Sequence, residues 1–243
     1  MKIIKLNATD STNSFLKKLE KNMTLENFTV IVTDMQLKGK GQQDSVWLSE
    51  PYKNLTFSVL IYFSDLLLRN ANFLNFAISA AIFDVLEKEN IPNLKIKWPN
   101  DILSANQKIC GVLLENNFKG VKIRSSVVGI GLNVNQTGFS KKLNKVSSLK
   151  LIANKEFNLD LLLHKLIKKI QENITLLNAK RFKLLENKYM NNLYKKNTAT
   201  MFKDSNNVVF MGIIVGVSHS GKLQIELENG MIKEYGIKEI AFL

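Results

Sequence analysis

The chain has 243 residues, of which 45% are hydrophobic and 23% charged, so it can bury a sizeable core and has the composition of a globular protein. It contains one cysteine and two widely separated histidines, which excludes an internal disulfide and a Cys/His zinc site. The first residues lack a secretory signal pattern, and no stretch has the roughly 18 consecutive apolar residues of a membrane span. We therefore expect a cytoplasmic protein with no membrane partner.

The net charge of +13 is concentrated between residues 141 and 203, where 15 Lys and Arg stand against four acidic residues. Apolar residues recur there at helical spacing, with lysines on the opposite face, which predicts long basic helices over 159–190. One interpretation is a solvated basic face, and another is a docking surface for an acidic partner. A nucleic-acid-binding module would also explain the charge, although such a site favours interleaved aromatic residues.

Hydrophobic patterns along the chain predict an α+β fold, a mixed sheet with helices. β-branched apolar runs mark strands, amphipathic runs mark helices, and glycine-bearing polar segments separate them. N-cap residue types at Asp10 to Asn13 precede the first helix. The predicted strands are 1–7, 28–36, 55–63, 94–98, 108–116 and 121–134, and the predicted helices are 14–22, 66–90 and 159–190.

The tail of the chain changes in character. From residue 198 onward, short apolar strands are separated by turn sequences at 219–222 and 228–230. This succession predicts a small separate β-barrel at the C-terminus.

A glycine-bearing loop follows the second predicted strand. Its turn Gly39-Lys40-Gly41 lies between Gln36 and Trp47, and it matches neither a Walker loop nor a dinucleotide fingerprint. Two glycines around a lysine nevertheless let backbone N–H groups and an ammonium converge on an anion. From spacing alone, the loop is either an anion site or an ordinary surface loop.

A second cluster joins Lys97-Trp98-Pro99-Asn100-Asp101 to Lys108. Pro99 keeps Trp98 out of helical conformation, so Asn100 and Asp101 fall at the carboxyl end of a strand, where α/β sites commonly lie. Lys108 opens an apolar strand, and in isolation the simpler explanation is an edge residue that reaches water. Glycines 129 and 131, further along, indicate a bulge or a close backbone approach.

Together these segments resemble the biotin protein ligases. Asp10 to Asn13, Gln36 to Trp47, Lys97 to Asp101, Lys108 to Gly111 and Gly129 to Asn133 occur in that family's order and approximate spacing. The resemblance implies a class II synthetase-like biotin/lipoate ligase catalytic domain over 1–190 and an SH3-like β-barrel over 191–243. It further implies a monofunctional form without an N-terminal DNA-binding module, and hence no DNA partner.

The resemblance also assigns site residues. Lys108 and Lys40 match the catalytic cations, and Asp101 matches the residue near magnesium. Positions matching the biotin-binding set are Ser11, Thr12, Asn13, Gln36, Gly39, Lys40, Gly41, Lys108, Gly111 and Gly129. Positions matching the ATP-binding set are Gln42, Trp47, Asn100, Asp101, Lys108 and Asn133.

The glycine-rich loop departs from the family pattern. Gln42 stands where the second basic residue is usual, and Asp44 and Ser45 replace a later glycine and arginine. The loop therefore carries less positive charge than is common in the family.

The implied activity is ATP- and Mg²⁺-dependent conversion of biotin to biotinyl-5′-AMP, followed by transfer to a lysine of a biotin carboxyl carrier protein domain. The implied partner belongs to acetyl-CoA carboxylase or a related biotin-dependent carboxylase, and we expect a monomer or weak homodimer. Lipoate ligases share the fold superfamily and remain the alternative, although the KWPND and GKG segments favour biotin.

Overall fold

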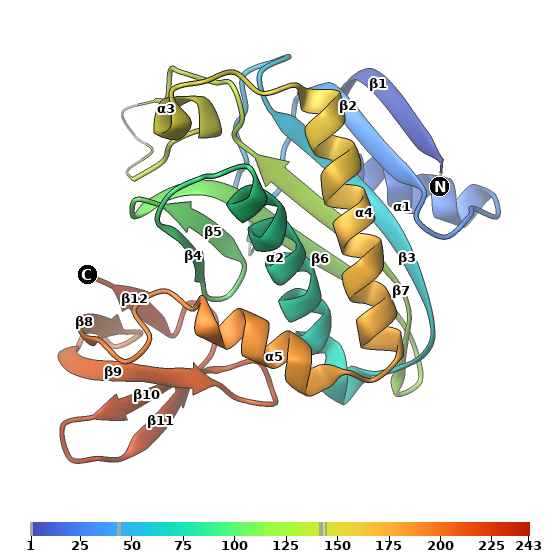
Figure 1. Cartoon of the computed structure of the whole chain (residues 1–243). Helices are drawn as coiled ribbons and strands as arrows, with labels where there is room; N and C mark the ends of the chain where they lie inside the picture. Colours follow the sequence, from blue (N-terminus) through green and yellow to red (C-terminus); the bar gives the residue numbers. More distant parts are fainter. Residues whose placement is uncertain (1, 43–44, 141–142, 144) are drawn as a thin grey trace.

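A seven-stranded mixed sheet occupies the first half of the chain in the computed structural model, which describes residues 2–42, 45–140, 143 and 145–243 (Figure 1). Its strand order is β1-β2-β3-β7-β6-β5-β4, and β1 and β2 form its parallel pair. The remaining neighbours are antiparallel. The strands are β1 (Ile3–Thr9), β2 (Val30–Gln36), β3 (Leu55–Leu67), β4 (Leu94–Lys97), β5 (Asp101–Ser104), β6 (Gln107–Lys119) and β7 (Lys122–Leu132).

Helices cover both faces of this sheet. α1 (Thr12–Asn22) packs on β2, β3 and β7, whereas α2 (Ala71–Lys88) and α4 (Leu159–Asn178) pack on each other and on the opposite face. α5 (Phe182–Asn191) adds to the second layer, and α3 (Leu149–Ala153) is a short helix beyond the sheet (Figure 1). Among the described residues, no helix is long and apolar enough to cross a membrane.

Helices can pack on both faces of the sheet because successive side chains along each strand point to opposite faces. On β3, Leu60 packs with Leu16 of α1 in a small cluster, while Val59 and Ile61 point into the large core under α2 and α4. Ser11 caps α1, since its hydroxyl accepts from the Ser14 N–H at 3.4 Å. This cap fixes where the helix begins and leaves its first turn over the middle of the sheet.

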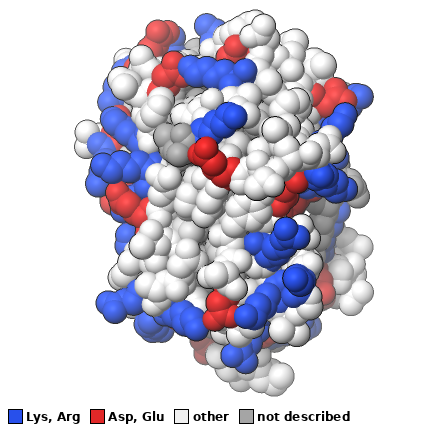
Figure 2. All heavy atoms as spheres, turned by 90° about the vertical axis from the view of Figure 1, so that its right-hand side faces the viewer, with Lys and Arg blue, Asp and Glu red and all other residues white. Residues whose placement is uncertain are grey.

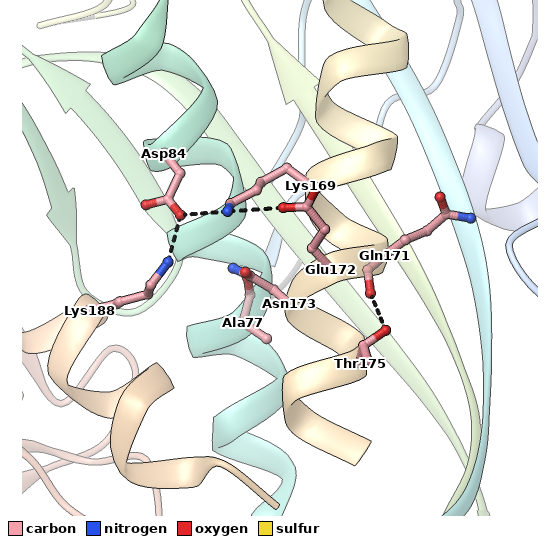
Figure 3. Close-up of polar contacts among 8 residues, drawn as sticks. All are labelled: Ala77, Asp84, Lys169, Gln171, Glu172, Asn173, Thr175 and Lys188. Carbon is pink, nitrogen blue, oxygen red and sulfur yellow. Dashed lines mark hydrogen bonds and ion pairs between the residues drawn. The ribbon is translucent and has the colours of Figure 1, made fainter. Parts of the chain in front are cut away.

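A partly buried charge cluster joins the helices α2, α4 and α5, which cover one face of the sheet (Figure 3). Asp84 of α2 accepts from Lys188 of α5 at 2.7 Å and from Lys169 of α4 at 3.2 Å, and Lys169 also contacts Glu172 at 3.1 Å. Partial burial lowers the pKa of Lys169, but its hydrogen bonds to Glu172 and Asp84 outweigh this and raise it. Nearby, buried Asn173 donates to the Ala77 carbonyl at 2.9 Å, so α2 and α4 are also joined by a neutral bond.

The predicted basic helices are α4 and α5, and many of their lysines pair with acids of neighbouring elements. Lys165 of α4 contacts Glu89 at 2.6 Å, and Lys180, in the turn between α4 and α5, contacts Asp65 at 3.3 Å. The side of the molecule shown in Figure 2 likewise has Lys and Arg in scattered groups interspersed with acidic residues. Part of the positive charge of this region is thus balanced within the chain.

A second, five-stranded antiparallel sheet follows α5, in the order β11-β10-β9-β8-β12. This confirms the predicted SH3-like β domain, although its edge strands β11 and β12 are not paired with each other and the sheet stays open. Aromatic side chains of this sheet pack on one another: the ring centres of Phe202 and Phe242 are 5.4 Å apart. The strands are β8 (Ala199–Asp204), β9 (Val209–Val217), β10 (Leu223–Leu227), β11 (Ile232–Tyr235) and β12 (Ile240–Phe242).

Besides the open second sheet, two further differences from the sequence predictions concern β3 and β5. The predicted helix over 66–90 begins only at Ala71, because β3 continues after a register shift and pairs Leu66 with Ile123 of β7. A 3-10 turn, η2 (Leu68–Asn70), then leads into α2. β5 was not predicted, since its four residues DILS are too short to show a period.

Removing the acid at the centre of the charge cluster should destabilise the fold. Asp84→Ala leaves Lys169 and Lys188, which are 19% and 31% exposed, without their shared counter-ion, so we expect a loss of unfolding free energy of about 1–3 kcal/mol. Glu186→Ala breaks a surface pair with Lys183 and should cost less than about 0.5 kcal/mol. Urea unfolding measures both, and equal losses would contradict this account of the cluster.

Candidate functional site

Three glycines on the α1 face of the sheet form the floor of a cavity. The cross-strand register aligns Asp101 of β5 with Gly111 of β6, Gly111 with Gly131 of β7, and Gly131 with Thr56 of β3. Two residues back, Gly129 pairs with Ser58. Since glycine has no side chain, no side chain covers this part of the sheet, and the face is open there.

The loop after β2 folds back over this floor. A Cβ on Gly131 would lie 2.3 Å from the Trp47 ring, and one on Gly111 would lie 3.2 Å from it, so the indole rests directly on both glycines. At the start of the loop, a Cβ on Gly39 would lie 2.2 Å from the Trp47 carbonyl oxygen. The backbone N–H of Trp47 donates to the Gly39 carbonyl at 3.0 Å, which closes the loop.

One end of the cavity is neutral and polar. The Gln36 side-chain oxygen accepts from the Thr12 backbone N–H at 3.0 Å, and Ser58 Oγ lies 2.7 Å from Thr12 Oγ1. Ser58 Oγ also lies 2.5 Å from the Asn13 amide oxygen. Thr12 and Asn13 are each 3% exposed, so these groups are fixed before any ligand enters.

The other end is charged. Lys108 Nζ contacts Asp101 Oδ1 at 2.7 Å, with the two side chains 33% and 22% exposed, and the same ammonium lies 5.5 Å from the centre of the Trp47 ring. Lys97 stands opposite Asp101 in the β4–β5 register. Burial lowers the pKa of Lys97, Asp101 opposes that shift, and Lys108 adds to it.

Asn100 and Asp101 reach the cavity because the turn before them is held by helices of the opposite layer. The Pro99 carbonyl accepts from the Asn75 amide of α2 at 2.5 Å and from the Tyr189 hydroxyl of α5 at 3.2 Å. Tyr189 is fully buried, and burial raises its pKa, so its hydroxyl stays a donor. The Asn100 side chain donates to the Val112 carbonyl of β6.

Trp98 faces away from the cavity, toward the C-terminal sheet. Its indole N–H donates to the carbonyl of Gly221, in the turn between β9 and β10, at 3.0 Å. Beside it, Lys97 Nζ lies 4.9 Å from the centre of the Phe242 ring. The KWPND segment therefore connects the cavity to the second sheet.

The cavity has a volume of about 310 Å³ and gathers most of the residues that the sequence singled out. Gly39, at the start of the loop, lies outside the lining, against Gln36 and Trp47. Asn133 is buried outside the lining and donates to the Ser147 carbonyl at 3.0 Å. Asp44 lies outside the described residues. The predicted residues that line the cavity are Ser11, Thr12, Asn13, Gln36, Lys40, Gly41, Gln42, Trp47, Asn100, Asp101, Lys108, Gly111 and Gly129.

Sequence reasoning left other parts of the site unassigned. Thr56 lines the cavity, as does Gly131, for which the sequence indicated only a bulge or a close backbone approach, and Ser58 and Glu115 hold the neutral end through Asn13. The period of two along β3, β6 and β7 could have placed them on one face, but only once the register between the strands was known.

The described residues do not form a metal site by themselves. No group of three His, Cys, Asp or Glu side chains in this part of the chain is arranged to hold a metal ion. Among the described residues that line the cavity, Asp101 is the one carboxylate. A metal here would need further ligands from a bound molecule.

Comparison with known proteins identifies the class to which this fold and site belong. The model of the biotin/lipoate A/B protein ligase family matches residues 6–133, which is more than half of the chain. The chain belongs to this family.

Within it, the chain is similar to several proteins named as biotin ligases, which confirms the resemblance drawn from the sequence. The biotin protein ligase from Aquifex aeolicus, solved in complex with biotin and ATP, matches with a TM-score of 0.80 and 28% identity over 100% of this chain and 98% of that one. The bifunctional ligase/repressor BirA of Bacillus subtilis is 32% identical over 126 residues, covering 52% of this chain and 38% of BirA. The biotin–[acetyl-CoA-carboxylase] ligase of Paracoccus denitrificans is 32% identical over 128 residues, covering 52% of each. The match thus spans about half or less of these two curated relatives.

The contact between Trp98 and Gly221 makes a prediction about stability. Trp98→Phe keeps an aromatic ring in the 6% exposed position but leaves the Gly221 carbonyl without this donor, so the unfolding free energy should fall by about 1 kcal/mol. Thermal or urea unfolding measures it. An unchanged midpoint would mean that this hydrogen bond does not help to join the two sheets.

Proposed function

We propose that this chain activates biotin with ATP to biotinyl-5′-AMP and transfers the biotinyl group to a lysine of a biotin carboxyl carrier protein domain. The observation that carries the proposal is the polarity of one cavity: neutral hydrogen-bonding groups at one end, and Lys108, Asp101 and Trp47 at the other. Biotin has the matching shape, a neutral cyclic urea joined by an apolar chain to a carboxylate. The likeness to ligases solved with biotin and ATP supports the same assignment.

In the first half-reaction, a carboxylate oxygen of biotin attacks the α-phosphorus of ATP. A new P–O bond forms, the bond to the β-phosphate oxygen breaks, and pyrophosphate leaves. Because two anions approach each other, fixed cations are needed where the charge develops. Lys108 supplies an ammonium held in place by Asp101, and Lys40 lines the same cavity from the loop.

Other residues have positioning roles in this proposal. Trp47 and Asn100 lie at the charged end, where they would contact the nucleotide, together with Gln42 from the loop. Asn133, which is buried behind the lining, would act by supporting β7 and the segment around Ser147. Gly111 and Gly129 leave room for biotin.

The donor set suits magnesium only together with ATP. Mg²⁺ commonly binds one or two carboxylates plus substrate phosphates, and Asp101 can supply the carboxylate. When bound, the ion would neutralise phosphate charge.

In the second half-reaction, the neutral amine of the carrier lysine attacks the carbonyl carbon of the adenylate. The amide bond forms, the nitrogen loses a proton and AMP leaves. The incoming amine is the nucleophile, so positioning supplies most of the rate enhancement. Cys110 is fully buried and burial raises the pKa of its thiol, which keeps it unreactive.

The transfer step is tested by incubating the chain with biotin, ATP, Mg²⁺ and a carrier domain and measuring biotin label on that domain. The label should be lost when the target lysine of the carrier domain is replaced by arginine.

Lys108 should be needed for the first half-reaction. Lys108→Ala removes a preorganised cation, so the single-turnover rate of pyrophosphate release should fall by roughly 10²- to 10³-fold. Lys122→Ala is the matched control, since Lys122 pairs with Asp65 on the surface, 49% exposed, and does not line the cavity. An unchanged rate for Lys108→Ala would mean that Lys108 is only an edge residue of β6 without a role in this step.

The neutral end should distinguish biotin from lipoate. Lipoate carries an apolar dithiolane ring, which would leave the polar groups of buried Thr12 and Asn13 and of half-buried Gln36 without ligand partners. Isothermal titration should therefore show biotin binding at least about 10²-fold more tightly. Tighter binding of lipoate would instead favour the lipoate ligase activity.

A further inference from the structure

We propose that Glu115 is a positioning residue for the neutral end of the cavity, with Lys17 as its counter-ion. This inference rests on the proposed function, because it concerns how that end binds a neutral cyclic urea. Glu115 acts through Asn13, the residue that it holds.

The side-chain amide of Asn13 has partners that fix its orientation. Its nitrogen donates to Glu115 Oε2 at 2.8 Å, and its oxygen lies 2.5 Å from Ser58 Oγ. A carboxylate only accepts hydrogen bonds, so it requires the amide nitrogen on its own side. Glu115 uses one of the two amide hydrogens and leaves the other for an acceptor on a ligand.

Packing holds the same amide in place. A Cβ on Gly129 would lie 2.4 Å from the Asn13 oxygen and 2.9 Å from its amide carbon, so the amide lies against the bare backbone of β7. Asn13 is 3% exposed. A hydrogen-bonding group held in this way offers its remaining donor without losing rotamer entropy on binding.

Lys17 balances the charge of Glu115. It lies four residues after Asn13 on α1 and pairs with the second carboxylate oxygen, Oε1, with the two side chains 40% and 29% exposed. An unbalanced carboxylate close to the cavity would disfavour an anionic ligand such as biotin. Lys17 thus lets Glu115 orient Asn13 without adding net negative charge.

The test is biotin affinity measured by isothermal titration without ATP. Glu115→Ala frees the Asn13 amide to rotate, so the Kd for biotin should rise about 10- to 100-fold, the scale of a hydrogen bond to a charged group. The KM for ATP and the kcat at saturating biotin should change less than about 3-fold. Lys17→Met should raise the Kd only about 3-fold, because that pair is partly exposed.

Two double variants test whether Glu115 acts on biotin binding through Asn13. Glu115→Gln with Lys17→Met restores a neutral acceptor for the amide, so biotin affinity should return to within about 3-fold of the unmodified chain. In an Asn13→Ala background, Glu115→Ala should have no further effect on biotin binding.

Glu20→Ala is the matched control. Glu20 also lies on α1 and accepts from Ser125 of β7 at 2.7 Å, but it does not line the cavity. Its loss should leave biotin affinity unchanged. If Glu115→Ala does not fold, Glu115→Leu, which is closer in volume, takes its place.

Several results would overturn the proposal. Unchanged biotin affinity in Glu115→Ala would do so, as would equal losses for biotin and ATP, or an undiminished effect in the Asn13→Ala background. Failure of the unmodified chain to bind biotin or to release pyrophosphate is a different result, because it would overturn the proposed function itself.

Discussion

The site depends on the register between β5, β6, β7 and β3. That register places Gly111, Gly129 and Gly131, which are separate in sequence, on one face of the sheet. Two of the three positions could not carry a side chain without displacing Trp47 or Asn13. A shift of one residue would turn these glycines to the other face and put large apolar side chains in the cavity. The large core under α2 and α4 opposes such a shift, because it fixes which residues of β3 and β7 are buried.

The floor is flanked by groups of different character, and the proposed chemistry follows from that difference. Neutral donors and acceptors gather where α1 begins, whereas Lys108 and Asp101 lie where β5 and β6 meet. The charged end is held from the other side of the molecule: α2 and α5 bind the Pro99 carbonyl, and the C-terminal sheet binds Trp98. The second sheet is therefore part of the support of the site.

Much of this could be predicted from the sequence. The helix cap at Ser11, the buried strands and the small β domain follow from local patterns, and the resemblance assigned most of the residues that line the cavity. Three features could not be predicted locally. The extension of β3 to Leu67 depends on pairing with β7, and the contribution of Gly131 depends on the position of Trp47. The contact between Glu115 and Asn13 spans 102 residues and exists only in the folded sheet.

We infer that biotin is activated over the three glycines of the sheet. The most direct test is a single-turnover measurement of pyrophosphate release after mixing with biotin, ATP and Mg²⁺, comparing the unmodified chain with Gly129→Ala. The added methyl group would stand 2.4 Å from the Asn13 oxygen and force the neutral end out of place. We predict a biotin-dependent burst of about one pyrophosphate per chain, slowed at least about 10-fold by the substitution. An equal burst from both proteins, or no burst that depends on biotin, would mean that biotin is not activated at this site.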